Sequence, residues 1–165
     1  MPRYLILMRH AKSSWKDPAL DDHDRPLNRR GRRAASALGG WMRDRGWVPD
    51  EVLCSTARRT RETLRRLDLP GAPTVRERRA LYLAEPEAML EVLRGAQGAC
   101  VLMLGHNPGI AEFAHRLIAA PPPHARFAGY PTGATLVAEF LVARWDQADW
   151  ARAEAVDFVV PRDLD

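Results

Sequence analysis

The chain has 165 residues, of which 46% are hydrophobic and 28% charged, and its formal net charge at pH 7 is +4. This size and balance fit one folded domain, which we expect to span residues 1–165, and they argue against intrinsic disorder. No apolar run reaches the roughly 18 residues of a membrane helix, and the first eight residues are too short for a signal-peptide core, so we expect a cytoplasmic protein.

The chain begins with a strand, a polar loop and a helix. Residues 4–8 are all apolar or aromatic, which predicts a buried strand, and the Asp-rich residues 13–27 predict a loop. Asn28 is a good N-cap and Gly46 a good helix stop, so a helix is predicted between them. Its predicted inner face consists of Ala34, Leu38, Trp41 and Met42.

The middle of the chain repeats the strand and helix pattern. Residues 51–54 predict a short strand, after which Ser55 is expected to cap a helix that ends before Pro70. A weak strand is predicted at 74–76 and a short helix at 86–94. The inner face predicted for the first of these helices consists of Ala57, Thr60, Leu64 and Leu67.

The last part of the chain contains its clearest strand. Six apolar residues occupy 99–104, and we expect Asn107 to cap the next helix with Pro108 as its first residue. Further strands are predicted at 135–142 and 155–160. Because strands alternate with helices, the sequence predicts an α/β fold, a three-layer α/β/α sandwich around a mostly parallel sheet.

Polar residues follow three of these strands. Arg9 and His10 follow the strand predicted at 4–8, and Ser55 leads from the strand at 51–54 to Arg59. His106 comes shortly after the clearest predicted strand, at 99–104. Ligands of such sheets bind beyond the carboxyl ends of the strands, so we expect these side chains to converge.

The chemistry of these residues suits phosphoryl transfer. Arg9 is expected to lower the pKa of His10, which keeps the imidazole neutral and nucleophilic near pH 7. Its guanidinium also offers a planar fork to two phosphate oxygens. Arg59, at the start of a helix, is a candidate second clamp, and His106 could bind a phosphoryl oxygen or position water.

Other features are interpreted as structural. Cys54 and Cys100 lie in apolar stretches, and we expect buried thiols. No metal-ligand spacing or nucleotide-binding glycine loop is present, so no metal or cofactor is expected. The acidic residues at 17–24 are interpreted as a mobile solvated loop. The remaining histidines are interpreted as structural or surface residues: His23, His115 and His124.

Four motifs, taken in order, resemble those of the histidine phosphatase superfamily. Arg-His-Ala-Lys-Ser at 9–13 resembles the Arg-His-Gly signature that follows the first strand of that family. Residues 25–31 resemble its Pro-Leu-Thr-x-x-Gly helix start, and residues 55–63 match its Ser-x-x-x-Arg-x-x-x-Thr pattern. Gly-His-Asn at 105–107 falls where its second histidine belongs, and Pro-Thr-Gly-Ala at 131–134 resembles a later element.

The resemblance implies a phosphoglycerate mutase-like fold and a metal-independent phosphatase. His10 would take the phosphoryl group, while Arg9, Arg59 and His106 would bind its oxygens. The short chain looks most like the SixA-type phosphohistidine phosphatases, which implies a phosphorylated signalling protein as substrate, such as a histidine-containing phosphotransfer domain. Two features depart from the family pattern: Ala11 replaces its glycine, and only Glu85 is a candidate general acid, a weak one.

Two alternatives remain open at this point. The same mechanism could act on a small phosphate ester. A basic nucleic-acid-binding protein without catalysis is the other class, because residues 1–79 carry 19 basic and 10 acidic groups whereas residues 80–165 carry 6 and 11. Against nucleic acid, the aromatic residues are not interleaved with the arginines as a stacking platform requires, so we expect no nucleic-acid partner.

Overall fold

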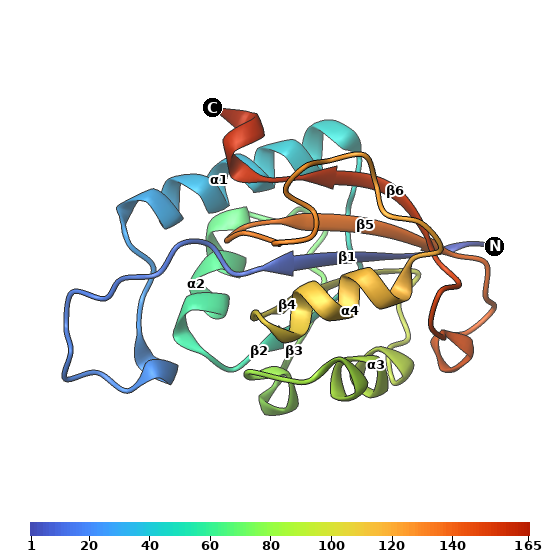
Figure 1. Cartoon of the computed structure of the whole chain (residues 1–165), viewed down its shortest axis with the longest axis horizontal. Coiled ribbons are helices and arrows are strands. Elements are labelled where there is room, and N and C mark those ends of the chain that lie inside the picture. Colours follow the sequence, from blue (N-terminus) through green and yellow to red (C-terminus); the bar gives the residue numbers. More distant parts are fainter.

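A computed structural model describes all 165 residues and contains one six-stranded sheet, in the order β3-β2-β4-β1-β5-β6 (Figure 1). The first four strands in this order are parallel, whereas β5 is antiparallel to both of its neighbours. The strands are β1 (Arg3–Arg9), β2 (Glu51–Ser55), β3 (Thr74–Arg78), β4 (Cys100–Gly105), β5 (Thr135–Phe140) and β6 (Glu154–Val159). The mostly parallel sheet predicted from the sequence is confirmed.

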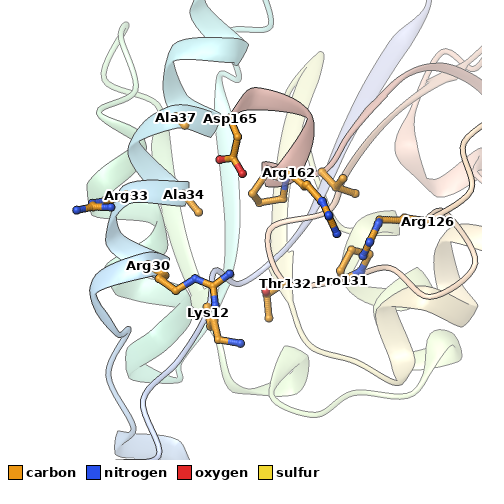
Figure 2. Close-up of a pocket in the computed structure, with 12 residues that line it drawn as sticks. Lys12, Arg30, Arg33, Ala34, Ala37, Arg126, Pro131, Thr132, Arg162 and Asp165 are labelled. Atoms are coloured by element: carbon orange, nitrogen blue, oxygen red, sulfur yellow. The ribbon is translucent and has the colours of Figure 1, made fainter.

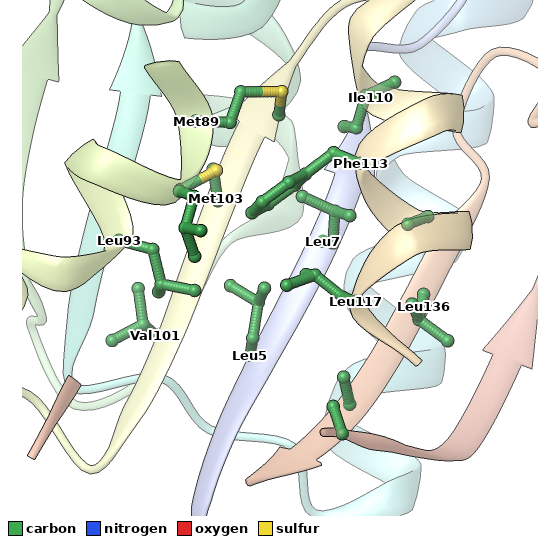
Figure 3. Packing of buried hydrophobic residues seen from close by; sticks show 14 of the residues in the cluster. Leu5, Leu7, Met89, Leu93, Val101, Met103, Ile110, Phe113, Leu117 and Leu136 are labelled. Atoms are coloured by element: carbon green, nitrogen blue, oxygen red, sulfur yellow. The ribbon is translucent and has the colours of Figure 1, made fainter. Parts of the chain in front are cut away.

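The helices cover both faces of the sheet, so the predicted three-layer sandwich is also confirmed. The helices are α1 (Arg29–Arg45), α2 (Arg58–Leu67), α3 (Pro86–Arg94) and α4 (Gly109–Leu117). Leu5 and Leu7 of β1 belong to the hydrophobic cluster that includes residues of α3 and α4 (Figure 3), whereas Ile6 and Met8 belong to the cluster that includes residues of α1 and α2. This alternation explains why β1 is apolar throughout.

The first predicted helix has the expected ends. Asn28 Oδ1 accepts the backbone N–H of Gly31 at 2.8 Å, and Gly46 ends α1 in the left-handed conformation with φ 76°. Of its predicted inner face, Leu38, Trp41 and Met42 are buried, whereas Ala34 is only partly buried and its neighbour Ala35 takes its place. Gly39 is required for packing, since a Cβ atom there would lie 2.1 Å from the carbonyl oxygen of Leu67 in α2.

Two predicted helix starts were wrong. α2 begins at Arg58, with Ala57 rather than Ser55 at the N-cap position. Ser55 instead remains in the sheet, paired with Arg78 of β3. α4 begins one residue later than predicted, after Pro108, although the Asn107 side chain still accepts the N–H of Ala111 at 3.2 Å.

The remaining elements differ little from the prediction. α3 has the predicted bounds, while β3 extends to Arg78 and is exposed along its whole length as an edge strand. Leu64, which was predicted on the inner face of α2, is only partly buried. Arg59 and Thr63, which were not predicted there, are buried. Cys54 is a buried free thiol, as expected, but Cys100 is only partly buried. None of the helices combines the length and apolar character needed to cross a membrane.

Candidate active site

A cleft of about 400 Å³ lies beyond the carboxyl ends of β1, β2 and β4, and all four residues predicted from the sequence line it. Arg9 and His10 come from the end of β1, Arg59 from the first turn of α2, and His106 from the residue after β4. The other lining residues are Lys12, Ser13, Trp15, Asp22, Arg25, Leu83, Asn107 and Thr132. The expected convergence at this edge of the sheet is therefore present.

His10 is held with one defined nitrogen free for chemistry. Its side chain is 5% exposed, and Nδ1 lies 2.6 Å from the carbonyl oxygen of Ala11. A carbonyl oxygen only accepts, so Nδ1 carries the proton and Nε2 keeps its lone pair. Burial, together with the positive charges of Arg59 and Arg9, lowers the pKa of His10 to about 3. The imidazole is therefore neutral at pH 7.

Two arginines present unused donors in the site. Arg9 Nη1 donates to the carbonyl oxygen of Tyr130 at 3.2 Å, and its Nε is buried without a partner. Arg59 is 3% exposed, and its Nη1 and Nη2 donate to the carbonyl oxygen and Oδ2 of Asp22 at 2.7 and 2.9 Å. Its Nε is likewise buried without a partner. An unsatisfied buried donor is costly, so each of these groups marks a place for an acceptor.

His106 is oriented by Ser55. Nε2 lies 2.8 Å from Ser55 Oγ, and that oxygen already accepts the N–H of Ala57 at 3.3 Å. These two contacts are the only hydrogen bonds of Ser55 Oγ, so we infer that the serine hydroxyl donates its proton to Nε2. In the neutral ring this leaves the proton on Nδ1, the third buried side-chain nitrogen without a partner.

The two histidine rings lie together and share their electrostatic surroundings. Their centroids are 5.3 Å apart. Burial, followed by the effects of His10 and Arg59, lowers the pKa of His106 to about 3. Both rings are therefore neutral in the empty cleft.

The loop after His10 is fastened by the other motif residues. The Ala11 N–H donates to Thr63 Oγ1 at 3.0 Å, which ties α2 to this loop. Gly31 permits the close approach of α1, because a Cβ atom there would lie 2.0 Å from the carbonyl oxygen of Lys12. Ala11 itself has no positive φ and is fully buried beside Leu27 and Ala35, so the backbone tolerates alanine where the family has glycine.

Sequence reasoning missed Asp22, which it assigned to a mobile solvated loop. Besides binding Arg59, its carboxylate accepts from Arg25 Nε at 3.1 Å and from the Tyr82 hydroxyl at 2.5 Å. Partial burial raises the pKa of Asp22, but hydrogen bonds from Tyr82 and Arg59 outweigh it and hold the pKa below its usual range. No spacing in the sequence relates Asp22 to Arg59, which lies 37 positions later.

Two further polar residues considered in the sequence analysis lie outside the cleft. The ring of His23 packs edge-on against Tyr82, with the ring centroids 4.8 Å apart, and its Nε2 lies 2.9 Å from Thr56 Oγ1. This histidine is therefore structural, as expected. Glu85, the weak candidate acid, occupies the N-cap position of α3, where it is exposed and does not line the cleft. No group of three or more His, Cys, Asp or Glu side chains is arranged to hold a metal ion.

Comparison with known proteins agrees with this geometry. Residues 5–82 match the model of the histidine phosphatase superfamily, branch 1. The uncharacterized protein Rv1276c of Mycobacterium tuberculosis is 36% identical over 162 residues, which cover 94% of this chain and all of that protein.

Two solved structures share the whole fold. One is the structure given provisionally as the phosphohistidine phosphatase SixA of Nakamurella multipartitia, with a TM-score of 0.86 and 32% sequence identity. The alignment covers 98% of this chain and 97% of that chain. The other is the protein histidine phosphatase SixA in complex with tungstate, with a TM-score of 0.78 and 20% sequence identity. The alignment covers 98% of this chain and 99% of that chain. The chain belongs to the histidine phosphatase superfamily.

Proposed function

We propose that this protein removes the phosphoryl group from phosphohistidine in another protein. The lone pair of His10 Nε2 attacks phosphorus, so that the Nε2–P bond forms while the P–N bond to the substrate breaks. The substrate imidazole leaves neutral if its other nitrogen already carries a proton. Water then attacks the phosphohistidine of the enzyme, which releases inorganic phosphate and returns the electron pair to Nε2.

The observation that carries the proposal is the set of three orphaned donors beside a neutral imidazole. Arg9 Nε, Arg59 Nε and His106 Nδ1 are the only buried side-chain nitrogen or oxygen atoms without a hydrogen-bond partner. The three residues that carry these atoms line the same cleft as His10. Preorganised donors of this kind stabilise the oxygens of a transferring phosphoryl group. A SixA structure of the same fold binds tungstate, a tetrahedral oxyanion of similar shape.

The choice of substrate rests on proton supply. Asp22 is the only carboxyl group that lines the cleft, and its contacts with Arg59 and Tyr82 keep it ionised. An ionised carboxylate cannot donate a proton to a leaving alkoxide. A protonated phosphoimidazole needs no such donor, so the cleft favours phosphohistidine over alkyl phosphate esters. The positive charge for the phosphoryl oxygens comes from the protein's own arginines, so we expect turnover in EDTA.

Three substrates separate these possibilities. Phosphate release is measured in EDTA from a phosphohistidine peptide, from a phosphoserine peptide of matched sequence, and from p-nitrophenyl phosphate. The last is an ester whose leaving group departs without protonation. We expect phosphohistidine to be the best substrate, p-nitrophenyl phosphate to be intermediate and phosphoserine to be the poorest. His10→Ala is the blank.

The order of the rates decides the assignment. Phosphoserine turnover equal to that of phosphohistidine would contradict the argument from Asp22 and would favour a small phosphate ester as substrate. Activity that persists in His10→Ala would contradict the nucleophile. Glu85→Gln is expected to leave all three rates unchanged, because that side chain is outside the cleft.

A further inference from the structure

A second depression, larger than the catalytic cleft, lies beside it. This groove has a volume of about 800 Å³ and is formed by α1, the segment before β5 and the end of the chain. Figure 2 shows Lys12 and Arg30 on one side of the groove and Arg126 and Arg162 on the other.

The groove carries a net positive charge, and its cations form no ion pairs. It is lined by five cations and by one acidic side chain, that of Asp165. None of the five, Lys12, Arg30, Arg33, Arg126 and Arg162, forms an ion pair within 4.0 Å. By contrast, Arg58 and Arg61 of α2 pair with Glu62 and Glu77. Unpaired positive charges close together repel one another, and an anionic partner would relieve that repulsion.

The groove is continuous with the cleft. Lys12 and Thr132 line both depressions. The two walls are also linked through the backbone, because the N–H of Gly133 donates to the carbonyl oxygens of Arg9 and His10 at 3.1 and 3.0 Å. A molecule whose phosphoryl group reaches His10 therefore lies beside the groove.

The two depressions differ in how their cations are held. Arg25 and Arg59 in the cleft are buried and fixed by hydrogen bonds, as suits one phosphoryl group. The five groove cations are all exposed and come from four separate parts of the chain, since Arg30 and Arg33 both belong to α1. Exposed, dispersed cations suit several carboxylates on a surface and steer its approach.

We propose that the groove docks an acidic surface of the phosphoprotein whose phosphohistidine enters the cleft. This inference rests on the proposed function, since it names the kind of protein that the site accepts. Docking would act mainly on the apparent affinity for the protein substrate and would weaken as salt is added.

The test uses two phosphohistidine peptides, one flanked by glutamates and the other by glutamines, with the full-length protein. Arg30→Glu/Arg162→Glu reverses two groove charges. Arg66→Glu/Arg152→Glu is the matched control, because both of these arginines are exposed, unpaired and outside the groove. We expect kcat/KM for the glutamate peptide to fall about tenfold more in the groove variant than in the control. The glutamine peptide should be affected equally in both variants.

A binding measurement keeps the groove testable if hydrolysis fails. A fluorescent glutamate-rich peptide without phosphate is titrated by anisotropy at low salt, with tungstate filling the cleft. Weaker binding to the groove variant than to the control supports docking even if neither phosphohistidine peptide is hydrolysed, and then only the proposed function fails. Equal binding by the two variants overturns the groove proposal, as does preference for a single-stranded oligonucleotide over the acidic peptide.

Discussion

The Ser55 hydroxyl lies 2.8 Å from Nε2 of His106 and joins the carboxyl ends of β2 and β4. The contact fixes which nitrogen of the imidazole carries the proton, and therefore which one can donate to a phosphoryl oxygen. Ser55 is fully buried, so water cannot replace its hydroxyl without rearrangement of the site. We infer that this serine is a positioning residue for His106.

Ser55→Ala should lower kcat by about tenfold, the equivalent of one hydrogen bond at roughly 1.4 kcal/mol. The reason is that His106 then loses its fixed tautomer while keeping its place in the cleft. The measurement is kcat and the inhibition constant of tungstate, with thermal unfolding as a check on the fold. An unchanged kcat together with a lower melting temperature would show a purely structural serine.

The second arginine of the site is Arg59, and its neighbour provides the control. Arg59→Ala removes a buried guanidinium with an orphaned Nε, and turnover should fall by at least two orders of magnitude if one clamp contributes about 3 kcal/mol. Arg58→Ala removes an exposed side chain whose only ion pair is with Glu62, which contributes about 0.3–0.5 kcal/mol. Similar kinetic losses at the two positions would contradict this assignment.

The parts of the site that could be predicted are those set by local signals and sheet topology. The carboxyl ends of parallel strands share one edge, which places His10 and His106 together before any side-chain geometry is known. Asn28 and Gly46 define α1 through contacts within one turn of the helix, so its bounds could also be predicted.

Two residues could not be assigned in this way. Ser55 has the ordinary pattern of an N-cap, and only the three-dimensional structure shows that its hydroxyl serves a histidine 51 positions away. Asp22 lies in a polar loop of ordinary composition, and its contact with Arg59 depends on how that loop folds over α2. Such long-range side-chain contacts leave no periodic or local signal in one sequence.

The neutral histidines make the stability of the fold depend on pH. In the folded protein His10 and His106 have pKa values of about 3, below the 6.5 of an exposed histidine, so between these values only the unfolded chain binds the protons. Stability therefore falls as the pH decreases from 7 to 5, by about 2 kcal/mol for each ring. Urea unfolding of the wild type, His10→Gln and His106→Gln at both pH values should show a smaller loss in each variant. Equal losses in all three proteins would contradict the neutral, buried state of these rings.

Adjacent glycines in α1 should respond in opposite ways to the same substitution. A Cβ atom on Gly39 would lie 2.1 Å from the backbone oxygen of Leu67, and a backbone atom cannot move aside without separating α1 from α2. Overpacking of this kind costs about 1–3 kcal/mol. A Cβ atom on Gly40 meets only the end of the Arg43 side chain at 4.0 Å, so the gain in helix propensity, up to about 1 kcal/mol, should dominate.

Urea unfolding of Gly39→Ala and Gly40→Ala measures both effects. The first variant should be less stable than the wild type and the second more stable. Because α2 carries Arg59 in its first turn and Thr63 beside Ala11, a displaced α2 should also weaken tungstate binding in Gly39→Ala alone. If Gly39→Ala were as stable as Gly40→Ala, the close contact between these two helices would be disproved.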